Sequence, residues 1–332
     1  MSVSSRKEIK DSVLSSTRQS SAQIGDLVND FINLTLNEIN DPAWAFPREM
    51  GFTHNWSWLR RKTTFASVAS TEDYVLPRDI DRISLIRQID TPTKLTQLSD
   101  ENFYRKVPYP TATGDPKYYR IWENEGVSTR LAVADTIDVV SSSASDAGTT
   151  TKTVTIWGKD ANGAKVSQTY QLNGTSTVSG TITFAAGPIF VSKQSATTGD
   201  VTVTENSGAT TLVVIGREER APRFKVISLY PIPSSSSTMY VEYYTRIREL
   251  TNDSDVPEFD AKWHWVVRLG TLSKVYQYLN KEADFTANQG MYSAGVRSMI
   301  SADRTQLDLI SHLSPDGIMP LYQLNRATTI TT

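Results

Sequence analysis

The sequence predicts an α+β fold: a helical bundle joined to an antiparallel β-region, with an inserted β-sandwich and an extended C-terminal arm. Apolar residues recur at helical spacing near both ends of the chain, and short runs with period-2 alternation fill its middle. Near the end, a Pro-Asp-Gly break at residues 315–317 precedes a short apolar stretch. We expect a host domain of residues 1–127 and 221–313, an insertion of residues 128–220 and an arm of residues 314–332.

Composition limits the classes of protein that this chain can represent. Its 332 residues are 39% hydrophobic and 21% charged, which is a globular composition with room for one large or two ordinary domains. Lys and Arg total 34 against 36 Asp and Glu, so the net charge is −2. Proteins that grip duplex DNA are usually clearly basic, and we therefore expect no tight DNA binding. Cysteine is absent, which excludes disulfides and thiolate metal sites.

The sequence carries no signal for export or membrane insertion. Residues 1–10 are polar and lack the apolar core of a signal peptide. No apolar run approaches the roughly 20 residues that a helix needs to span a bilayer. We expect a soluble protein that is assembled inside the cell and has no membrane partner.

Two helices are predicted at the start of the chain. Ser5 and Glu8 have the spacing of a capping box, which predicts a first helix to about Thr17. A second helix begins near Ser20 and ends before Asp41-Pro42, because proline disfavours helix at the residue before it. Its apolar face is formed by Ile24, Leu27, Val28, Phe31 and Leu34.

The β-region is predicted from runs on both sides of the insertion. Two strands with clear alternation follow the insertion and are separated by Pro231-Ile-Pro and a serine run. A short helix is expected at Ser99–Arg105. The predicted strands are Thr63–Ser70, Asp73–Leu76, Ile80–Ile89, Tyr118–Glu123, Arg223–Tyr230 and Thr238–Thr245.

The last third of the chain is predicted to be helical. Asp255 is the expected N-cap of a helix, with Pro257 in the first turn and Glu258 three residues after the cap. That helix continues to Leu279, and a further helical stretch follows over Asp284–Leu313. Gly290 and Gly295 are expected to divide this stretch into two pieces.

The insertion is marked by a change in composition. From residue 128 to residue 220 serine and threonine become dense, glycine recurs and charges are fewer. Asn173-Gly174 is a strong hairpin signal, and seven strand-like runs alternate apolar with polar residues. Seven short strands with regular turns over about ninety residues predict an immunoglobulin-like β-sandwich.

Candidate chemistry is sparse, and we expect neither an enzyme nor a cofactor or metal site. No nucleotide-binding, hydrolase or zinc motif occurs, and His54, His264 and His312 are far apart in sequence. Four carboxylates, Asp253, Asp255, Glu258 and Asp260, could be read as a calcium site. Helix capping and the helix dipole explain them more simply.

The order of the elements after the insertion resembles one known family. A strand ending in LYPIP (229–233), a YVEYY strand (240–244) and LTNDSDVPEF (250–259) before an aromatic helix are similar to the head-to-tail adaptor (connector) proteins of tailed bacteriophages. The resemblance covers the host domain, about two thirds of the chain, and leaves out the insertion. It implies a structural virion protein at the head–tail junction, assembled in the host cytoplasm.

The resemblance also implies partners. Family adaptors form a closed, dodecameric ring that joins the portal protein to a tail or nozzle protein and continues the DNA channel. Genomic DNA would pass through the lumen without tight binding. In the family the C-terminal arm reaches the portal, which assigns the portal interface here to Ile318, Met319, Leu321, Tyr322 and Leu324.

Two alternatives remain open at this stage. The chain could be a receptor-binding or capsid decoration protein that uses its immunoglobulin-like domain, or a glycan hydrolase whose carboxylates the sequence does not locate. Native mass measurement separates a ring-forming connector from a decoration protein. A panel of glycan substrates tests the hydrolase.

Overall fold

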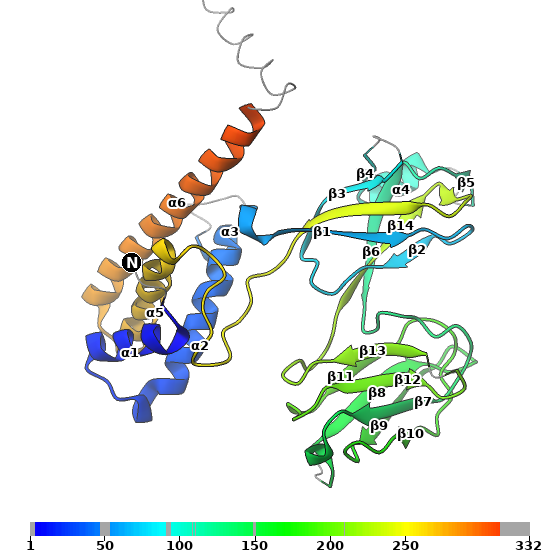
Figure 1. Cartoon of the computed structure of the whole chain (residues 1–332), viewed down its shortest axis with the longest axis horizontal. Coiled ribbons are helices and arrows are strands. Elements are labelled where there is room, and N and C mark those ends of the chain that lie inside the picture. The colour runs from blue at the N-terminus through cyan, green and yellow to red at the C-terminus, as the bar shows by residue number, and fades with distance from the viewer. Residues whose placement is uncertain are drawn as a thin grey trace, which may run out of the picture. The chain divides into compact units, whose positions relative to one another are not determined.

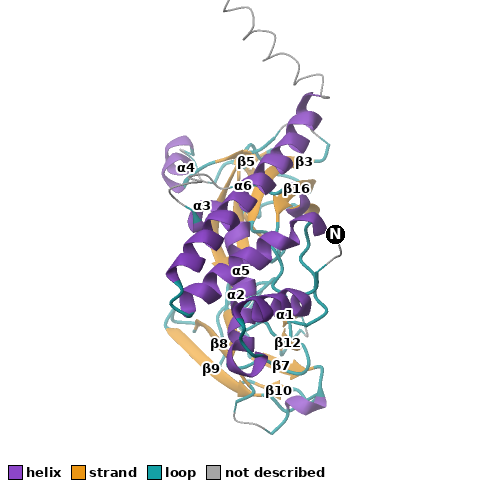
Figure 2. Cartoon of the chain, turned by 90° about the vertical axis from the view of Figure 1, so that its left-hand side faces the viewer, coloured by secondary structure: helices purple, strands orange, loops and turns teal. Residues whose placement is uncertain are grey.

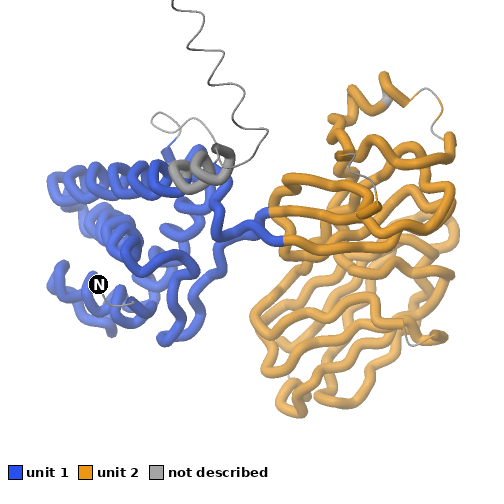
Figure 3. The backbone as a smooth tube through the Cα atoms, turned by 45° about the horizontal axis from the view of Figure 1, so that its top comes forward, with its two compact units in different colours: residues 1–61, 244–332 blue, residues 62–243 orange. Residues whose placement is uncertain are grey.

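The protein divides into two compact units, one of them assembled from both ends of the chain. The computed structural model describes residues 4–46, 54–90, 94–107, 109, 111–148, 151–208 and 210–312. Residues 1–61 and 244–332 make up the first unit, and residues 62–243 make up the second (Figure 3). The chain passes between the units along strands β1 (Arg60–Ala66) and β16 (Thr238–Tyr244), which are neighbours in one sheet.

The expected fold class needs correction, because strands rather than a helical bundle dominate the protein. Strands β1 to β16 form several sheets across residues 60–244, whereas the long helices are confined to residues 6–40 and 264–312 (Figure 1). Two strand pairs, β4 with β6 and β5 with β15, are parallel, so the β-region is not purely antiparallel. Strands dominate because residues that alternate between apolar and polar, the period-2 pattern of a strand, occupy the longest continuous part of the sequence. The chain is α+β with a sheet-rich unit.

The first unit is a set of helices around one hydrophobic core. Helices α5 and α6 lie side by side, and α5 also packs on α1 and α2 (Figure 2). Fully buried Val28, Ile32 and Val267 belong to the core, together with Trp56 from the loop before β1. The elements are α1 (Arg6–Thr17), α2 (Ser21–Asn40), α3 (Pro42–Ala45), η1 (Ser57–Leu59), η3 (Ala261–Trp263), α5 (His264–Tyr278) and α6 (Glu282–His312).

The two N-terminal helices begin and end where the sequence predicts. The Ser5 N–H donates to Glu8 Oε2 at 2.7 Å, and the Glu8 N–H donates to Ser5 Oγ at 3.3 Å, which confirms the capping box. These bonds satisfy donors that have no partner inside the helix. Helix α2 ends at Asn40, directly before Asp41-Pro42.

Asp255 does not cap a helix, and this prediction was wrong. Its Oδ2 accepts the N–H groups of Thr251 and Asn252, both at 2.8 Å, and so closes a turn. The backbone carbonyl of Asp255 accepts the N–H of Arg6 at 2.7 Å, which satisfies a free donor at the start of α1. The helical part begins later, at η3, where Asp260 is the N-cap and accepts the Lys262 N–H at 3.1 Å.

Helix α6 is continuous through Gly290 and Gly295, so the predicted division was wrong. Gly295 has a packing role, since an added Cβ would lie 3.0 Å from the Trp265 ring of α5. Gly270 in α5 is more constrained: its Cβ would lie 2.5 Å from Thr35 Cγ2 and 2.8 Å from the Tyr292 ring. Glycine at this position allows α2, α5 and α6 to approach one another closely.

Two glycine-to-alanine substitutions are expected to change stability in opposite directions. Gly270→Ala should destabilise the helical unit by about 1–3 kcal/mol, because Thr35 and Tyr292 are fully buried and must shift. Gly290→Ala should stabilise it by about 0.5–1 kcal/mol, since its Cβ would meet no atom within 4 Å and alanine favours helix. Denaturant unfolding followed by circular dichroism measures both. If the two substitutions changed the free energy of unfolding equally, close packing of α2, α5 and α6 at Gly270 would not limit stability.

The second unit contains a set of paired strands that flank residues 128–220. In one sheet β14 lies between β2 and β6, and in another β16 lies between β1 and β3. Ile227, Leu229, Met239 and Val241 are fully buried in the core that they share. The elements are β2 (Asp73–Val75), β3 (Arg82–Gln88), β4 (Thr96–Gln97), α4 (Asp100–Lys106), β5 (Thr113–Gly114), β6 (Tyr118–Glu125), β14 (Phe224–Tyr230) and β15 (Ile232–Pro233).

Strands β7 to β13, here called the two-sheet module, form two sheets with the orders β10-β7-β12-β13 and β11-β8-β9. Its core includes Val154, Tyr170, Phe184 and Val203, and Phe224 of β14 belongs to the same core. Five of the strands agree with the period-2 runs in the sequence. The other two are shorter than predicted: β7 begins later than the run Arg130–Val140, and β10 covers only part of the run Thr177–Phe184. The elements are β7 (Ile137–Ser141), η2 (Ala144–Asp146), β8 (Thr153–Lys159), β9 (Lys165–Gln171), β10 (Val178–Ser179), β11 (Phe190–Lys193), β12 (Val201–Glu205) and β13 (Thr211–Ile215).

Candidate docking groove on the helical unit

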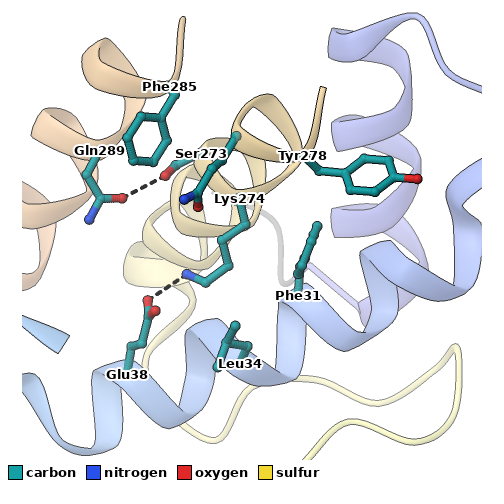
Figure 4. A pocket seen from close by; sticks show the side chains of 9 residues that line it. Phe31, Leu34, Glu38, Ser273, Lys274, Tyr278, Phe285 and Gln289 are labelled. Carbon is teal, nitrogen blue, oxygen red and sulfur yellow. Dashed lines mark hydrogen bonds and ion pairs between the residues drawn. The ribbon is translucent and has the colours of Figure 1, made fainter. Parts of the chain in front are cut away.

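A groove of about 380 Å³ opens between α2, α5 and the first turns of α6 (Figure 4). Its walls are partly apolar, and one ion pair lies within it. The lining residues are Phe31, Leu34, Glu38, Ser273, Lys274, Gln277, Tyr278, Phe285 and Gln289.

The apolar walls come from both sides of the groove. Leu34, three residues after Phe31 on α2, is 38% exposed, and Tyr278 at the end of α5 is 56% exposed. Phe285 stands on the first turns of α6. The turn between α5 and α6 is tight because Asn280 adopts a left-handed backbone conformation, with φ of 56°. Tyr278, before this turn, and Phe285, after it, both line the groove (Figure 4).

A Lys–Glu pair lies in the groove. Lys274 Nζ donates to Glu38 Oε2 at 2.6 Å, and both side chains are largely buried. Burial lowers the pKa of Lys274, and the Glu38 carboxylate opposes this shift. The Tyr292 hydroxyl donates to the same carboxylate oxygen at 3.1 Å, and Lys274 Nζ lies 5.3 Å from the centre of the Tyr292 ring. These contacts join α2, α5 and α6.

Tyr292 is fully buried behind this pair. Burial raises its pKa well above the usual value, and the negative charge of Glu38 adds to the effect. At neutral pH Tyr292 is therefore a hydrogen-bond donor. Ser273 Oγ donates to Gln289 Oε1 at 2.6 Å and links α5 to α6 at the edge of the groove.

The geometry is suited to binding an apolar segment of another chain. Exposed aliphatic and aromatic side chains surround the Lys274–Glu38 pair, whose charges already neutralise each other. An apolar partner would therefore not bury an unpaired charge. Among the residues that the structure describes, no cluster of His, Asp and Glu has the arrangement of a metal site. None of the described helices is long and apolar enough to cross a membrane.

A second polar cluster in this unit was missed by sequence reasoning. Asp303 on α6 has Oδ2 2.7 Å from His54 Nε2, and its Oδ1 accepts the Ser57 hydroxyl at 2.5 Å. Burial alone would raise the pKa of Asp303, but the bonds from His54 and Ser57 lower it overall. Ser57 donates to the carboxylate rather than to the imidazole, so the cluster anchors the loop before β1 to α6. His54 and Asp303 are 249 residues apart, and no local pattern could have indicated their contact.

The residues predicted from sequence to bind a partner belong to the last part of the sequence. Ile318, Met319, Leu321, Tyr322 and Leu324 lie outside the described residues. The predicted acidic cluster is divided between separate roles. Asp255 closes a turn and Asp260 caps η3, while Glu258 Oε1 lies 3.9 Å from Arg248 Nε.

The groove has the exposed apolar walls that are typical of protein interfaces, and a comparison with known families supports a protein that associates with others. Residues 166–315 match the model of a family described as SU10 adaptor protein. The match spans less than half of the 332 residues and runs from β9 past the end of α6. No curated protein matches the chain.

This match supports a phage structural adaptor protein, a component of the virion that associates with other virion proteins. It also corrects one expectation from the sequence. We expected the adaptor resemblance to leave out residues 128–220, but the match includes residues 166–220. The two-sheet module shares its core with Phe224 of β14, the strand that follows it in the chain.

Proposed function

We propose that the protein is a head-to-tail adaptor that forms a ring between the portal and the tail and continues the DNA channel. The observation that carries this proposal is the SU10 adaptor match, which includes strands of the second unit and α5 and α6 of the first. The exposed apolar walls of the groove add support, since exposed apolar surface of this kind is typical of protein interfaces.

The partners follow from this role. The ring consists of twelve copies of this chain in the proposal, with the portal protein on one side and a tail or nozzle protein on the other. Genomic DNA passes through the lumen without being held, in keeping with a net charge of −2. The protein would be assembled in the host cytoplasm and reside at the head–tail junction of the virion.

Native mass spectrometry and negative-stain images of the purified protein, alone and with portal, test the ring. A closed ring of copies, or one that closes on the portal, is the expected result. A protein that stays monomeric with portal present would contradict the proposal. It would favour the decoration alternative, in which the two-sheet module binds a capsid or receptor. Turnover of a glycan substrate would instead favour the hydrolase alternative.

We also propose that residues 1–127 with 221–313, residues 128–220 and residues 314–332 are separate domains of the adaptor. Replacing residues 128–220 by a short Gly/Ser linker should leave the melting transition of the helical unit in place. That unit has its own core, and none of the described residues in this core comes from the segment 128–220. Thermal melts followed by circular dichroism measure this, and loss of the helical transition would contradict the domain division.

The apolar side chains of Ile318, Met319, Leu321, Tyr322 and Leu324 are proposed as the portal interface. Burial of such side chains is worth about 1.5–3 kcal/mol each, so their removal should abolish portal binding. The melting temperature of the isolated subunit should change little after deletion of Ile318–Thr332. Pull-down with portal and thermal melts provide the two measurements.

A matched control is available within the same segment. Deletion of Asn325–Thr332 keeps all five apolar residues and should keep portal binding. If the longer deletion destabilises the subunit by several kcal/mol while portal binding survives, the segment belongs to the fold of the subunit and the assignment is wrong.

A further inference from the structure

A second cleft lies on the sheet-rich unit and is lined in part by residues of β8, β9 and β11. These three strands lie side by side in one sheet of the two-sheet module (Figure 1). Its volume of about 770 Å³ is within the roughly 300–1,000 Å³ typical of small-molecule sites. Two large aromatic side chains line it: Trp157 is 43% exposed and Phe190 is 37% exposed. Neither the adaptor role nor the family match assigns a ligand to this cleft.

The strand register places the two aromatic residues beside each other. Phe190 of β11 pairs with Trp157 of β8, and Trp157 pairs with Ser167 of β9 on its other side. Paired residues on one face of a sheet have Cβ atoms about 4.5–5.5 Å apart, so the two side chains are neighbours on one face of the sheet.

A row of hydroxyl groups continues the same face. Side chains two residues apart on a strand share a face, which places Ser192, Thr155 and Thr169 next to the aromatic row. Thr155 Oγ1 and Thr169 Oγ1 are 3.1 Å apart and hydrogen-bonded. The face therefore offers an apolar surface and, beside it, groups that both donate and accept hydrogen bonds.

Close packing holds the cleft in shape without a ligand. An added Cβ at Gly126 would lie 2.7 Å from Phe190 Cα, so glycine lets the chain after β6 pack directly against β11. The Arg223 guanidinium carbon lies 5.5 Å from the centre of the Phe190 ring. In the β8–β9 hairpin, Asp160 Oδ1 accepts the N–H groups of Asn162 and Ala164, both at 2.9 Å. A preformed site loses little conformational entropy on binding.

The charges lining the cleft balance each other. Two of its ionisable lining residues are basic, Lys159 and Lys165, and two are acidic, Glu123 and Asp160. Nucleic acid sites combine aromatic side chains with an excess of positive charge, which is missing here. The lining therefore matches a neutral ligand with an apolar face. The row of hydroxyl groups lies beside the cleft rather than in its lining, and it suits a ligand that extends along the sheet and carries many hydroxyl groups.

We propose that this cleft binds a neutral glycan, with one sugar ring stacked on Trp157 beside Phe190. The C–H face of the ring covers the aromatic surface, and its hydroxyl groups bond to the neighbouring hydroxyl, ammonium and carboxylate groups. No covalent chemistry is involved. The inference does not rest on the adaptor function, since it depends only on the described residues of the sheet-rich unit.

Titration of the full chain with neutral oligosaccharides tests the proposal. Maltohexaose, cellohexaose, mannohexaose and chitohexaose, each at up to about 10 mM, detect dissociation constants of about 1 mM or tighter by calorimetry. At least one should bind, with little change between about 50 and 500 mM salt because the ligand is neutral. Failure of all four, or binding that salt abolishes, would overturn the proposal.

Variants locate the binding. Trp157→Ala and Phe190→Ala should each weaken it at least about tenfold, or about 1.4 kcal/mol, whereas Trp157→Phe should retain most of it because the stacking surface remains. Tyr109→Ala is the control, since Tyr109 is a 73% exposed aromatic residue that does not line the cleft.

Two results would refute the assignment to this cleft. In the first, the alanine variants bind as tightly as the unchanged protein. In the second, no glycan binds and light scattering shows that Trp157→Ala removes a concentration-dependent self-association. The face would then be an interface between copies of the chain.

Discussion

Replacing Asp146 by asparagine should lower the free energy of unfolding of the sheet-rich unit by about 3 kcal/mol. The Asp146 side chain is fully buried, and its two oxygens accept four hydrogen bonds. The donors are the Ser141 hydroxyl at 2.6 Å, the N–H groups of Thr198 and Gly199 at 2.8 and 2.9 Å, and Lys152 Nζ at 3.1 Å. An amide would place its NH₂ group against one of these donors and remove the charge.

The same residue should make the two-sheet module sensitive to acid. Burial alone would raise the pKa of Asp146, but the bonds from Ser141, Thr198, Gly199 and Lys152 hold it well below its usual range. A lowered pKa in the folded state means that the carboxylate stabilises the fold above its unfolded pKa of about 3.9. This stabilisation is lost as the pH falls from about 4 through the folded-state pKa.

Urea unfolding at pH 7 and at a series of values below pH 4 measures both effects. The unchanged protein should lose stability steeply over the acid range, and Asp146→Asn should lose less of it because it lacks this carboxylate. Asp160→Asn is the matched control. Asp160 accepts two backbone N–H groups but is only partly buried, so its replacement should lower the free energy of unfolding by less than about 1 kcal/mol. Equal costs at the two positions would show that burial of Asp146 has no special importance.

Lys274→Met should destabilise the helical unit by about 2–3 kcal/mol, because the largely buried Glu38 carboxylate would lose its cationic partner and keep the uncharged Tyr292 hydroxyl as a hydrogen-bond donor. The value is below the full cost for a completely buried pair, since the side chains of Lys274 and Glu38 are 10% and 16% exposed. Methionine keeps the length and apolar contacts of the lysine stem.

The double variant Lys274→Met with Glu38→Gln separates charge from packing. Removing both charges should restore most of the lost stability, as replacement of buried pairs by uncharged residues often does. Guanidinium unfolding of the single and double variants gives the interaction energy. If the double variant is as unstable as Lys274→Met, the loss comes from packing on Tyr292 and the ion pair contributes nothing.

Local signals in the sequence identified much of the secondary structure. Ser5 and Glu8 located the start of α1 because a capping box is a contact between near neighbours in the chain. The alternating residues Val154 and Ile156 located β8 for a similar reason, since burial on one face of a strand repeats every second residue. Asp255 was assigned wrongly because a turn and an N-cap use the same bonds from a carboxylate to backbone N–H groups.

The candidate site could not be predicted in the same way. Lys274 and Glu38 are 236 residues apart, and neither occurs in a pattern that distinguishes it from an exposed charge. Gly290 and Gly295 look alike in the sequence, but their surroundings differ: an added Cβ would lie close to the Trp265 ring at Gly295 and would contact nothing at Gly290. The relative amounts of helix and sheet were also predicted wrongly, with too much weight given to the helices. Each predicted strand is a short pattern, whereas a helical pattern extends over several turns and is easier to recognise.

The order in which the ribosome makes the chain affects when the groove can exist. Helices α1 and α2 emerge early, but their partners α5 and α6 follow only after the whole of residues 62–243. With about 220 residues between the end of α2 and the start of α5, synthesis at about 5–20 residues per second imposes a delay of roughly 10–45 s. During that interval Phe31 and Leu34 have no facing wall from α5 or α6. The groove is therefore completed only after α5 and the first turns of α6 have been made, and a nascent subunit cannot use it to engage a partner before that point.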